Sequence, residues 1–333
     1  MPSSAAKAMG CDRWINGRAV GRHRSAAARP TNRDAWVHPA QRRLAELMCR
    51  LFALHAGRRD VRAEFWMLEA PTSLAVQSEV NADGFGIAAL SADDALLLIR
   101  NPVQASADRL YRGVAREAEA CQFLVHLRYA NTGRTSLSNT HPFLQDGRLF
   151  AHNGVVGDLE RLERRLGEHR AMVSGDTDSE RLFALITLCI RAADGDVPAG
   201  ITAAVRELAD GFALYSINFV LAEAGHLWAF RYPEHNPLLI LEKAGDAVGR
   251  LVERDAHGTL RVHAECHDEQ PMVVIASEPM DADPEWREVG VGELVHVAPD
   301  LTVERQTLLS GPPRHQMVLS GAAEQSQSYE RDH

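Results

Sequence analysis

The chain has 333 residues, 45% of them hydrophobic and 24% charged, an ordinary globular composition with room for one large domain or two modest ones. Its formal net charge of −9 argues against a protein that coats nucleic acid, because phosphate binding depends on clustered Lys and Arg. No stretch approaches the roughly 18 consecutive apolar residues of a membrane-spanning helix, so we expect a soluble, cytoplasmic protein with neither a nucleic-acid nor a membrane partner.

The first 48 residues differ from the rest of the chain. Residues 1–47 carry nine Lys/Arg against three Asp/Glu and show little apolar periodicity. This bias predicts a basic, disordered extension, and an organellar transit peptide would share it. A propeptide cleaved after Met48 and a misassigned start at Met48 are two further hypotheses for this segment. We favour the misassigned start, because Met48 directly precedes Cys49.

From Cys49 onward there is no linker, repeat or low-complexity run before a polar tail at residues 310–333, so residues 49–309 are predicted to form one domain. Short apolar, β-branched or aromatic runs, many flanked by Gly, Asp or Pro, predict strands. The predicted strands are Phe85–Leu90, Phe123–Tyr129, Leu149–His152, Leu214–Ala222, Leu227–Tyr232, Leu238–Leu241, Met272–Ala276 and Leu294–Val297.

Apolar residues at helical spacing predict helices between these strands. The predicted helices are Ala107–Ala120, Leu159–His169, Asp178–Ala193 and Ile201–Ala209. Because strands dominate the two ends of the domain and helices interrupt the middle, the order is typical of an α+β fold.

Four short motifs occur in order along the predicted domain. They are Met48-Cys49-Arg50, His126-Leu127-Arg128-Tyr129-Ala130-Asn131, Ala151-His152-Asn153-Gly154 and Asp176-Thr177-Asp178-Ser179-Glu180. Each is weak alone, since Asn-Gly is typical of turns and an Arg on a strand is usually a solvated edge residue. Three further segments accompany them: Asn81 to Gly86, Asn139 to Phe143 and Ala276-Ser277-Glu278-Pro279.

Together these segments resemble the class II glutamine amidotransferases, above all the small stand-alone members of that family, from Cys49 to roughly Val297. The resemblance implies a four-layer αββα sandwich, the Ntn-hydrolase fold, in which two mainly antiparallel sheets pack face to face between helices. It also implies an amidohydrolase that cleaves the γ-amide of glutamine, or of a γ-glutamyl compound, through a thioester intermediate.

The resemblance assigns catalytic roles to Cys49, Asn153 and Gly154. The thiol of Cys49 attacks, and its own α-amine relays the proton once Cys49 is N-terminal, which suits an amine whose usual pKa is about 7.7–8.0. The Asn153 side-chain amide and the Gly154 backbone N–H match the family's oxyanion hole. Taken alone, Asn153-Gly154 would instead be interpreted as a hairpin turn.

The resemblance also implies a site for the charged end of a glutamyl group. Arg128 matches the position that binds the α-carboxylate, which Arg can hold with two parallel hydrogen bonds. Asp178 matches the position that binds the α-ammonium, although a carboxylate there also suits a helix N-terminus. Tyr129, His152 and Thr177 are predicted to line the same substrate site.

A metal centre built from His126, His141 and His152 is a weaker interpretation, because the spacing lacks an H-x-x-x-H or paired-carboxylate signature. In the family, these histidines frame the pocket. The five cysteines are widely spaced and include no C-x-x-C pair, which argues against a disulfide framework or structural zinc. We therefore expect neither a metal nor a cofactor.

Two features depart from the family pattern. A nucleophile whose base is its own amine requires that nothing be attached to that amine, whereas 48 residues precede Cys49 here. Some family members also have Trp after the strand Arg and a Thr-His pair beyond it, where this chain has Tyr129, Asn131 and Thr132.

The fate of the leaving group stays open at the level of sequence. A glutaminase subunit would pass ammonia to a separate ammonia-accepting synthase, since no synthase domain fits within this chain. A stand-alone γ-glutamyl amide hydrolase, like the ergothioneine-pathway members of the family, would release an amine. A non-catalytic binding module is the third hypothesis, although Cys49, Asn153 and Arg128 are all present.

Overall fold

The computed structural model describes residues 48–129, 135–244, 251–254, 260–263 and 270–319. The described residues all belong to one compact unit. The predicted extension at residues 1–47, the end of the predicted tail at residues 320–333, and the positions of Asn131 and Thr132 lie outside the described residues.

The first sheet has seven antiparallel strands and carries the segment that follows Cys49. In spatial order they are β15 (Arg287–Glu288), β11 (Leu239–Lys243), β14 (Met272–Ala276), β1 (Arg50–His55), β6 (Gln122–Leu127), β3 (Phe85–Leu90) and β4 (Leu96–Asn101). Strand β1 is central and buried along its whole length. The start of β1, and with it Cys49, is therefore fixed by neighbours on both sides.

The second sheet also has seven strands, of which only β18 runs parallel to its neighbour. The order is β17 (Val303–Thr307), β16 (Glu293–Val297), β10 (His226–Arg231), β9 (Ala213–Glu223), β8 (Arg148–Val156) and β7 (Phe143–Gln145), with β18 (His315–Gln316) beside β9. Two further strand pairs are β2 (Val61–Arg62) with β5 (Glu119–Ala120) and β12 (Leu251–Arg254) with β13 (Leu260–His263). Part of the predicted polar tail thus pairs with the second sheet.

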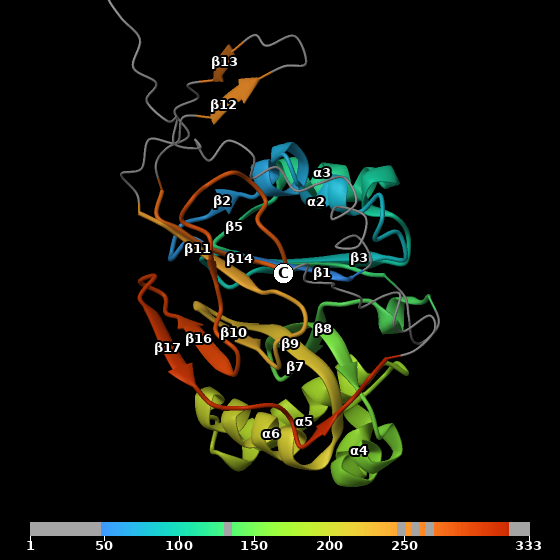
Figure 1. Cartoon of the computed structure of the whole chain (residues 1–333). Helices are drawn as coiled ribbons and strands as arrows, with labels where there is room; N and C mark the ends of the chain where they lie inside the picture. Colours follow the sequence, from blue (N-terminus) through green and yellow to red (C-terminus); the bar gives the residue numbers. More distant parts are fainter. Residues whose placement is uncertain (1–47, 130–134, 245–250, 255–259, 264–269, 320–333) are drawn as a thin grey trace, which may run out of the picture. The chain divides into compact units, whose positions relative to one another are not determined.

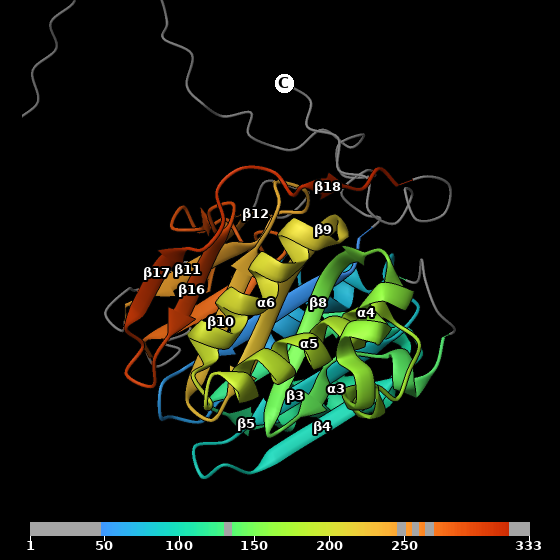
Figure 2. The same cartoon turned by 90° about the horizontal axis from the view of Figure 1, so that it is seen from below.

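Helices form the two outer layers (Figure 1). The first sheet is covered by η1 (Phe65–Glu69), α2 (Leu74–Gln77), η2 (Ala105–Ala107) and α3 (Arg109–Glu117). The second is covered by α4 (Leu159–Leu166), η4 (Gly167–Met172), α5 (Asp178–Ala192) and α6 (Val197–Gly211), and Figure 2 shows α4 to α6 across its outer face. A short turn, η3 (Leu137–Asn139), precedes β7.

Alternation along the strands separates three apolar cores. On β1, Phe52 and Leu54 pack with Trp66 under the first helical layer, whereas Leu51 and Ala53 face the second sheet. The inter-sheet core contains side chains from both sheets, and the third core joins the second sheet to α4, α5 and α6. This layering confirms the predicted αββα sandwich.

Most predicted elements occur with boundaries shifted by a few residues, but two long strands of the first sheet, β1 and β4, were not predicted. Helix α5 begins at Asp178 as predicted, because Thr177 caps it and its side chain accepts from the Glu180 N–H at 3.3 Å. Among the described helices, none has the length and apolar character that crossing a membrane would require.

Candidate active site

Cys49 lies one residue before β1, at the edge of the inter-sheet space. Side chains alternate along a strand, and Cys49 stands two residues before Leu51 and four before Ala53. The Cys49 side chain therefore faces the second sheet, as theirs do. The Tyr129 backbone N–H donates to Cys49 Sγ at 3.3 Å, and the thiol donates to the Tyr129 carbonyl oxygen at 3.4 Å. The thiol is thus held by the segment that follows β6.

The surroundings of Cys49 keep its thiol protonated at neutral pH. Burial raises the pKa of the Cys49 thiol, and Asp178 raises it further. The Tyr129 backbone contact and the positive charges of Arg128 and Arg50 lower the pKa, but burial has the larger effect. A base is therefore needed before the thiol can attack.

Asn153 approaches Cys49 from the opposite sheet. Its side-chain Nδ2 donates to the backbone carbonyl oxygen of Cys49 at 2.9 Å. Its Oδ1 is buried and has no hydrogen-bond partner among the described residues. The register of β8 shifts between Val155 and Val156, directly after the Asn153-Gly154 pair. A bulge at this point re-aims the backbone beside the nucleophile.

Gly154 lies where two strands come unusually close. A Cβ on this residue would overlap the backbone carbonyl of Ser216 on β9 and crowd the His152 ring. The hairpin-turn alternative for Asn153-Gly154 is wrong. Both residues lie inside strand β8, where Asn153 pairs with Asn218 and Gly154 with Ile217 of β9. Glycine is required here by the close approach of the chains.

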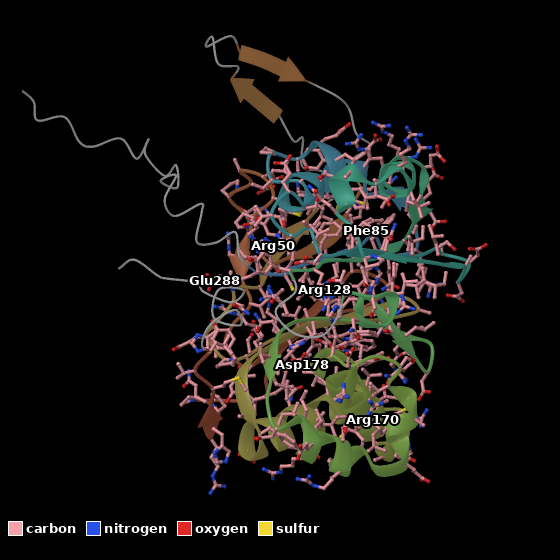
Figure 3. All side chains as sticks on the ribbon, turned by 90° about the vertical axis from the view of Figure 1, so that its right-hand side faces the viewer. Arg50, Phe85, Arg128, Arg170, Asp178 and Glu288 are labelled. Atoms are coloured by element: carbon pink, nitrogen blue, oxygen red, sulfur yellow. The ribbon has the colours of Figure 1, made fainter. Side chains whose placement is uncertain are left out.

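Arg128 follows β6 and is tied to the start of β3. The Arg128 backbone N–H donates to the Gly84 carbonyl oxygen at 2.8 Å, and the Asp83 N–H donates to the Arg128 carbonyl at 3.1 Å. The side chain of Arg128 is buried and lines the pocket. Arg128 thus comes from the layer of the first sheet, and Asp178 from the layer of α5 (Figure 3).

The N-terminus of α5 carries the acidic side of the pocket. Asp178 is the first residue of α5, where the helix dipole favours a carboxylate, and its Oδ2 accepts from the Val156 N–H at 2.9 Å. Asp178 therefore serves the helix as well as facing the pocket. Thr177 lines the pocket too, although its hydroxyl oxygen is engaged as the cap of α5.

His152 is held in one tautomer. Its Nε2 lies 3.3 Å from the Ser216 carbonyl oxygen, which can only accept, so Nε2 carries the proton. Nδ1 then accepts from the Ser179 hydroxyl at 2.9 Å. Burial lowers the pKa of His152, which keeps the ring neutral.

His126 and His141 complete the pocket as neutral imidazoles. Their ring centroids are 4.1 Å apart, and both rings are buried. Burial, followed by the nearby charge of Arg128, lowers the pKa of His126 to about 3. Burial and the neighbouring rings also hold the pKa of His141 well below its usual value. Neither ring adds charge to the site.

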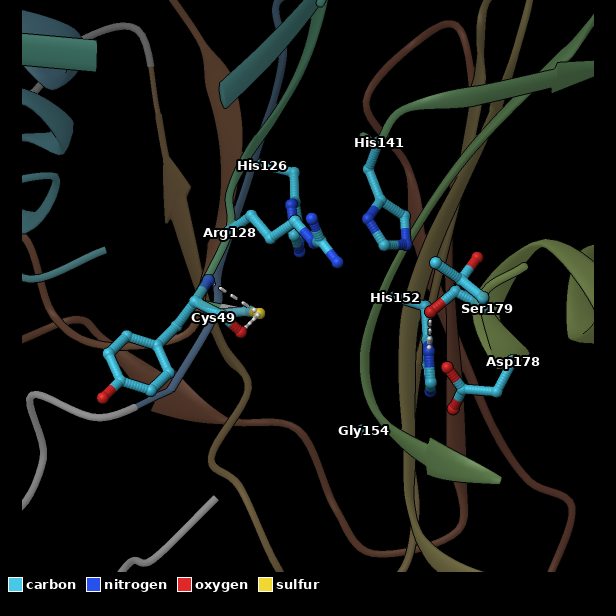
Figure 4. A pocket seen from close by; sticks show the side chains of 10 residues that line it. Cys49, His126, Arg128, His141, His152, Gly154, Asp178 and Ser179 are labelled. Carbon is cyan, nitrogen blue, oxygen red and sulfur yellow. Dashed lines mark hydrogen bonds between the residues drawn. The ribbon is translucent and has the colours of Figure 1, made fainter. Parts of the chain in front are cut away.

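These residues surround one pocket. It is lined by Cys49, His126, Arg128, Tyr129, His141, His152, Gly154, Thr177, Asp178 and Ser179. Figure 4 shows Cys49, His126 and Arg128 facing His141, His152 and Asp178 across it. The structure thus brings the predicted site residues together, with Asn153 beside Cys49. Ser179 was not singled out, because its contact with His152 has no signal in the sequence. Within the described residues, no group of three or more His, Cys, Asp or Glu could hold a metal ion.

Comparison with known proteins places this site in a family. Residues 48–312 match the family model described as class II glutamine amidotransferases. YafJ of Escherichia coli (strain K12), named as a glutamine amidotransferase, is 27% identical over 183 residues, which cover 53% of this chain and 69% of that protein. A Haemophilus influenzae protein named in the same way is 22% identical over 261 residues, 76% of this chain and 85% of that protein.

A solved structure agrees at the level of the fold. The glutamine phosphoribosylpyrophosphate amidotransferase of B. subtilis matches with a TM-score of 0.57 and 18% identity over 79% of this chain. The match covers 50% of that enzyme, so this chain spans about half its length. The fold, the ordered motifs and the match over residues 48–312 lead to one conclusion: this chain belongs to the class II glutamine amidotransferases, enzymes that act on the amide of glutamine.

Proposed function

We propose that Cys49 is the nucleophile of an amidohydrolase acting on glutamine or a γ-glutamyl compound. The Cys49 sulfur bonds to the γ-carbonyl carbon, the carbon–nitrogen bond breaks, and ammonia or an amine leaves with the thiol proton. Water then hydrolyses the thioester, which releases glutamate and restores the Cys49 thiol. The observation that carries this proposal is the 2.9 Å contact from Asn153 Nδ2 to the Cys49 carbonyl, which puts an amide donor beside the thiol.

The α-amine of Cys49 is the base in this proposal. The thiol needs one, because burial raises its pKa. Among the described residues, the hydrogen-bond partners of Cys49 Sγ are backbone atoms of Tyr129 and not an imidazole. An amine with a usual pKa of about 7.7–8.0 can accept the proton at neutral pH. The enzyme is then active only after Cys49 has become the first residue.

Asn153 and Gly154 stabilise the negative charge that develops on the γ-carbonyl oxygen. The side-chain amide of Asn153 and the backbone N–H of Gly154 are neutral donors, and they are fixed by strand pairing before substrate arrives. The hydrogen bond from Asn153 Nδ2 to the Cys49 carbonyl oxygen orients the side-chain amide toward Cys49.

Arg128 and Asp178 recognise the charged end of the glutamyl group. They line the pocket from opposite sides, with the nucleophile beside them. Arg128 binds the α-carboxylate and Asp178 the α-ammonium, while Tyr129, His152 and Thr177 complete the walls. Neutral histidines suit this arrangement, because a positive charge at His152 would compete with the ammonium for Asp178.

An ammonia acceptor on a separate protein accounts for the leaving group. This chain covers half of the B. subtilis amidotransferase, so the remainder of that enzyme has no counterpart in the match.

We also propose a cytoplasmic location, since Cys49, Cys121 and Cys189 are free thiols and a thiol nucleophile works in a reducing compartment. The proposed catalytic domain spans residues 49–309, and residues 1–48 and the polar tail at 310–333 lie outside it.

The test is glutamate and ammonia release from L-glutamine by protein translated from Met48, with intact mass confirming that Cys49 is N-terminal. We expect turnover that Cys49→Ala abolishes and that Asn153→Ala reduces by about a hundredfold or more. Cys189→Ala is the matched control, because Cys189 is buried in α5 away from the pocket and its loss affects packing alone.

Two results would contradict the mechanism. The first is undiminished turnover by Cys49→Ala. The second is equal turnover by a chain in which residues 1–48 remain attached, since the amine would then be locked in a peptide bond. Release of an amine from a γ-glutamyl amide without release of ammonia from glutamine would identify the stand-alone hydrolase instead.

A further inference from the structure

Arg50 is a buried cation directly after the nucleophile. The residue is 3% exposed, and its side chain leaves β1 on the opposite face from that of Cys49. Its Nη1 donates to the backbone carbonyl oxygen of Met48 at 2.7 Å. Its Nε lies 3.4 Å from Oε1 of Glu278, whose side chain is 28% exposed.

This contact fixes the distance from the guanidinium to the Cys49 nitrogen. A carbonyl oxygen lies about 2.3 Å from the amide nitrogen of the next residue, so Arg50 Nη1 lies within about 5 Å of Cys49 N. That nitrogen becomes the α-amine when Cys49 is N-terminal. The Met48 carbonyl leaves with Met48, and the 3.4 Å contact with Glu278 then keeps the positively charged guanidinium beside the amine.

The segment containing Glu278 is itself anchored to β1. The Leu51 N–H donates to the Ser277 hydroxyl oxygen at 2.9 Å, and the Ser277 N–H donates to the Leu51 carbonyl oxygen at 3.0 Å. The Ala276-Ser277-Glu278-Pro279 motif therefore binds β1 at the residue next to Arg50, which gives this motif a role at the site.

We propose that Arg50 and Glu278 are positioning residues that hold the α-amine of Cys49 in place and keep it unprotonated, so that it can accept the thiol proton. This inference rests on the proposed function of Cys49. The guanidinium disfavours a second positive charge nearby, and Glu278 fixes the guanidinium while offsetting part of its field.

The other charged groups near Cys49 are Arg128 at the end of β6 and Asp178 on α5, and their charges oppose each other. The neighbouring histidines are neutral. Glu278 is the more exposed partner of Arg50, so solvent screens its charge more strongly and the guanidinium dominates. A charge about 5 Å from the amine, at the partly solvated edge of the protein, shifts the pKa of the amine by about one unit.

The experiment compares pH profiles of kcat/KM for L-glutamine in protein with Cys49 N-terminal. We expect Arg50→Gln to move the acidic limb to higher pH by about one unit, because the amine then holds its proton more tightly. Glu278→Gln moves the limb to lower pH, since the cation is no longer offset, and Arg50→Lys restores it toward the parent value. KM changes by less than about twofold, because the glutamyl group contacts other residues.

Arg231→Gln is the matched control. Arg231 is also a buried Arg, bound to Glu288 at 2.8 Å and to the Val289 carbonyl at 2.8 Å, and it lies outside the pocket. Its loss is expected to lower the melting temperature without moving the acidic limb. A uniform fall in rate at every pH for Arg50→Gln, with an unmoved limb, would overturn the proposal and leave Arg50 a structural role alone.

A second measurement does not depend on turnover. In protein labelled with 13C-cysteine, the Cys49 resonances, assigned by their absence in Cys49→Ala, report the titration of its amine. Coincident titrations of the amine in the parent and Glu278→Gln proteins would overturn the proposal even if Arg50→Gln does not fold. Activity that survives Cys49→Ala would instead overturn the proposed function, so the two failures are distinguishable.

Discussion

The residues of the site differ in how far the sequence reveals them. Cys49, Arg128, Asn153 and Asp178 stand in motifs whose order resembles a family. The structure brings Cys49, Arg128 and Asp178 to one pocket and hydrogen-bonds Asn153 to the Cys49 carbonyl. The pairing of Arg50 with Glu278 has no such signal, because it depends on β1 lying beside β14, and these strands are more than 200 residues apart in the sequence. Contacts set by strand register cannot be read from local pattern.

Gly154 gives a prediction at the residue scale. Gly154→Ala is expected to destabilise the fold by several kcal/mol, roughly the cost of overpacking a closed core, and to abolish turnover, because the new Cβ meets the Ser216 carbonyl. Gly113→Ala on α3 is the control, since its Cβ enters open space and helix propensity favours it by about 0.5–1 kcal/mol. Urea unfolding of both variants measures the difference; equal stabilities would refute the close-approach argument.

Among the elements, β3 and β14 were predicted with both bounds correct, α5 with its start correct, and β1 was missed. Helix α5 has its start signalled by Thr177 and Asp178 as well as by apolar spacing. Strand β1 is a six-residue run buried on both faces, without the alternation that marks a half-buried strand. Burial on both sides therefore removes the local pattern from the strand that positions the nucleophile.

The cap of α5 gives a prediction at the element scale. Thr177→Ala is expected to lower the free energy of unfolding by about 1 kcal/mol, since the Glu180 N–H loses its acceptor. KM for glutamine should also rise, because Asp178 follows in the first turn. Thr202→Ala on α6 is the matched control, a half-buried Thr within the helix whose hydroxyl donates to the Pro198 carbonyl. If both variants unfold at the same urea concentration, the cap does not stabilise α5.

The layering of the whole molecule followed from the resemblance and not from the predicted strands. Counting strands cannot divide them between two sheets, because pairing connects distant segments: β1 pairs with β14 and β6, and β8 with β9. The pocket takes Cys49 and Arg128 from one sheet and Gly154 from the other. The site is therefore a property of the assembled sandwich.

The buried histidines predict how the stability of the whole protein depends on pH. The pKa values of His126, His141 and His152 are lowered in the folded state, to about 3 for His126. The unfolded chain therefore binds protons first, and stability present above pH about 6.5 is lost as the pH falls toward the folded values, by at most about 1.4 kcal/mol per pH unit for each group.

Urea unfolding between about pH 7 and about pH 5 measures this loss before most carboxylates titrate. The midpoint should fall steeply over this range. His141→Asn should reduce the slope, because one of the buried neutral imidazoles is then absent. A midpoint independent of pH in the parent protein would contradict the burial of neutral histidines.

The inter-sheet core has a consequence for how activity is tuned. Alanines, among them Ala53, Ala88, Ala151 and Ala229, lie between the Leu, Ile and Val side chains of that layer, and together these side chains set the thickness of the sandwich. The Cys49 sulfur lies on one sheet and the Asn153 amide on the other. The thickness of this layer therefore also sets the distance between the nucleophile and the proposed oxyanion donor. A methyl group added to this core, far from any substrate atom, is therefore expected to lower the rate by changing the spacing between the sulfur and the Asn153 amide.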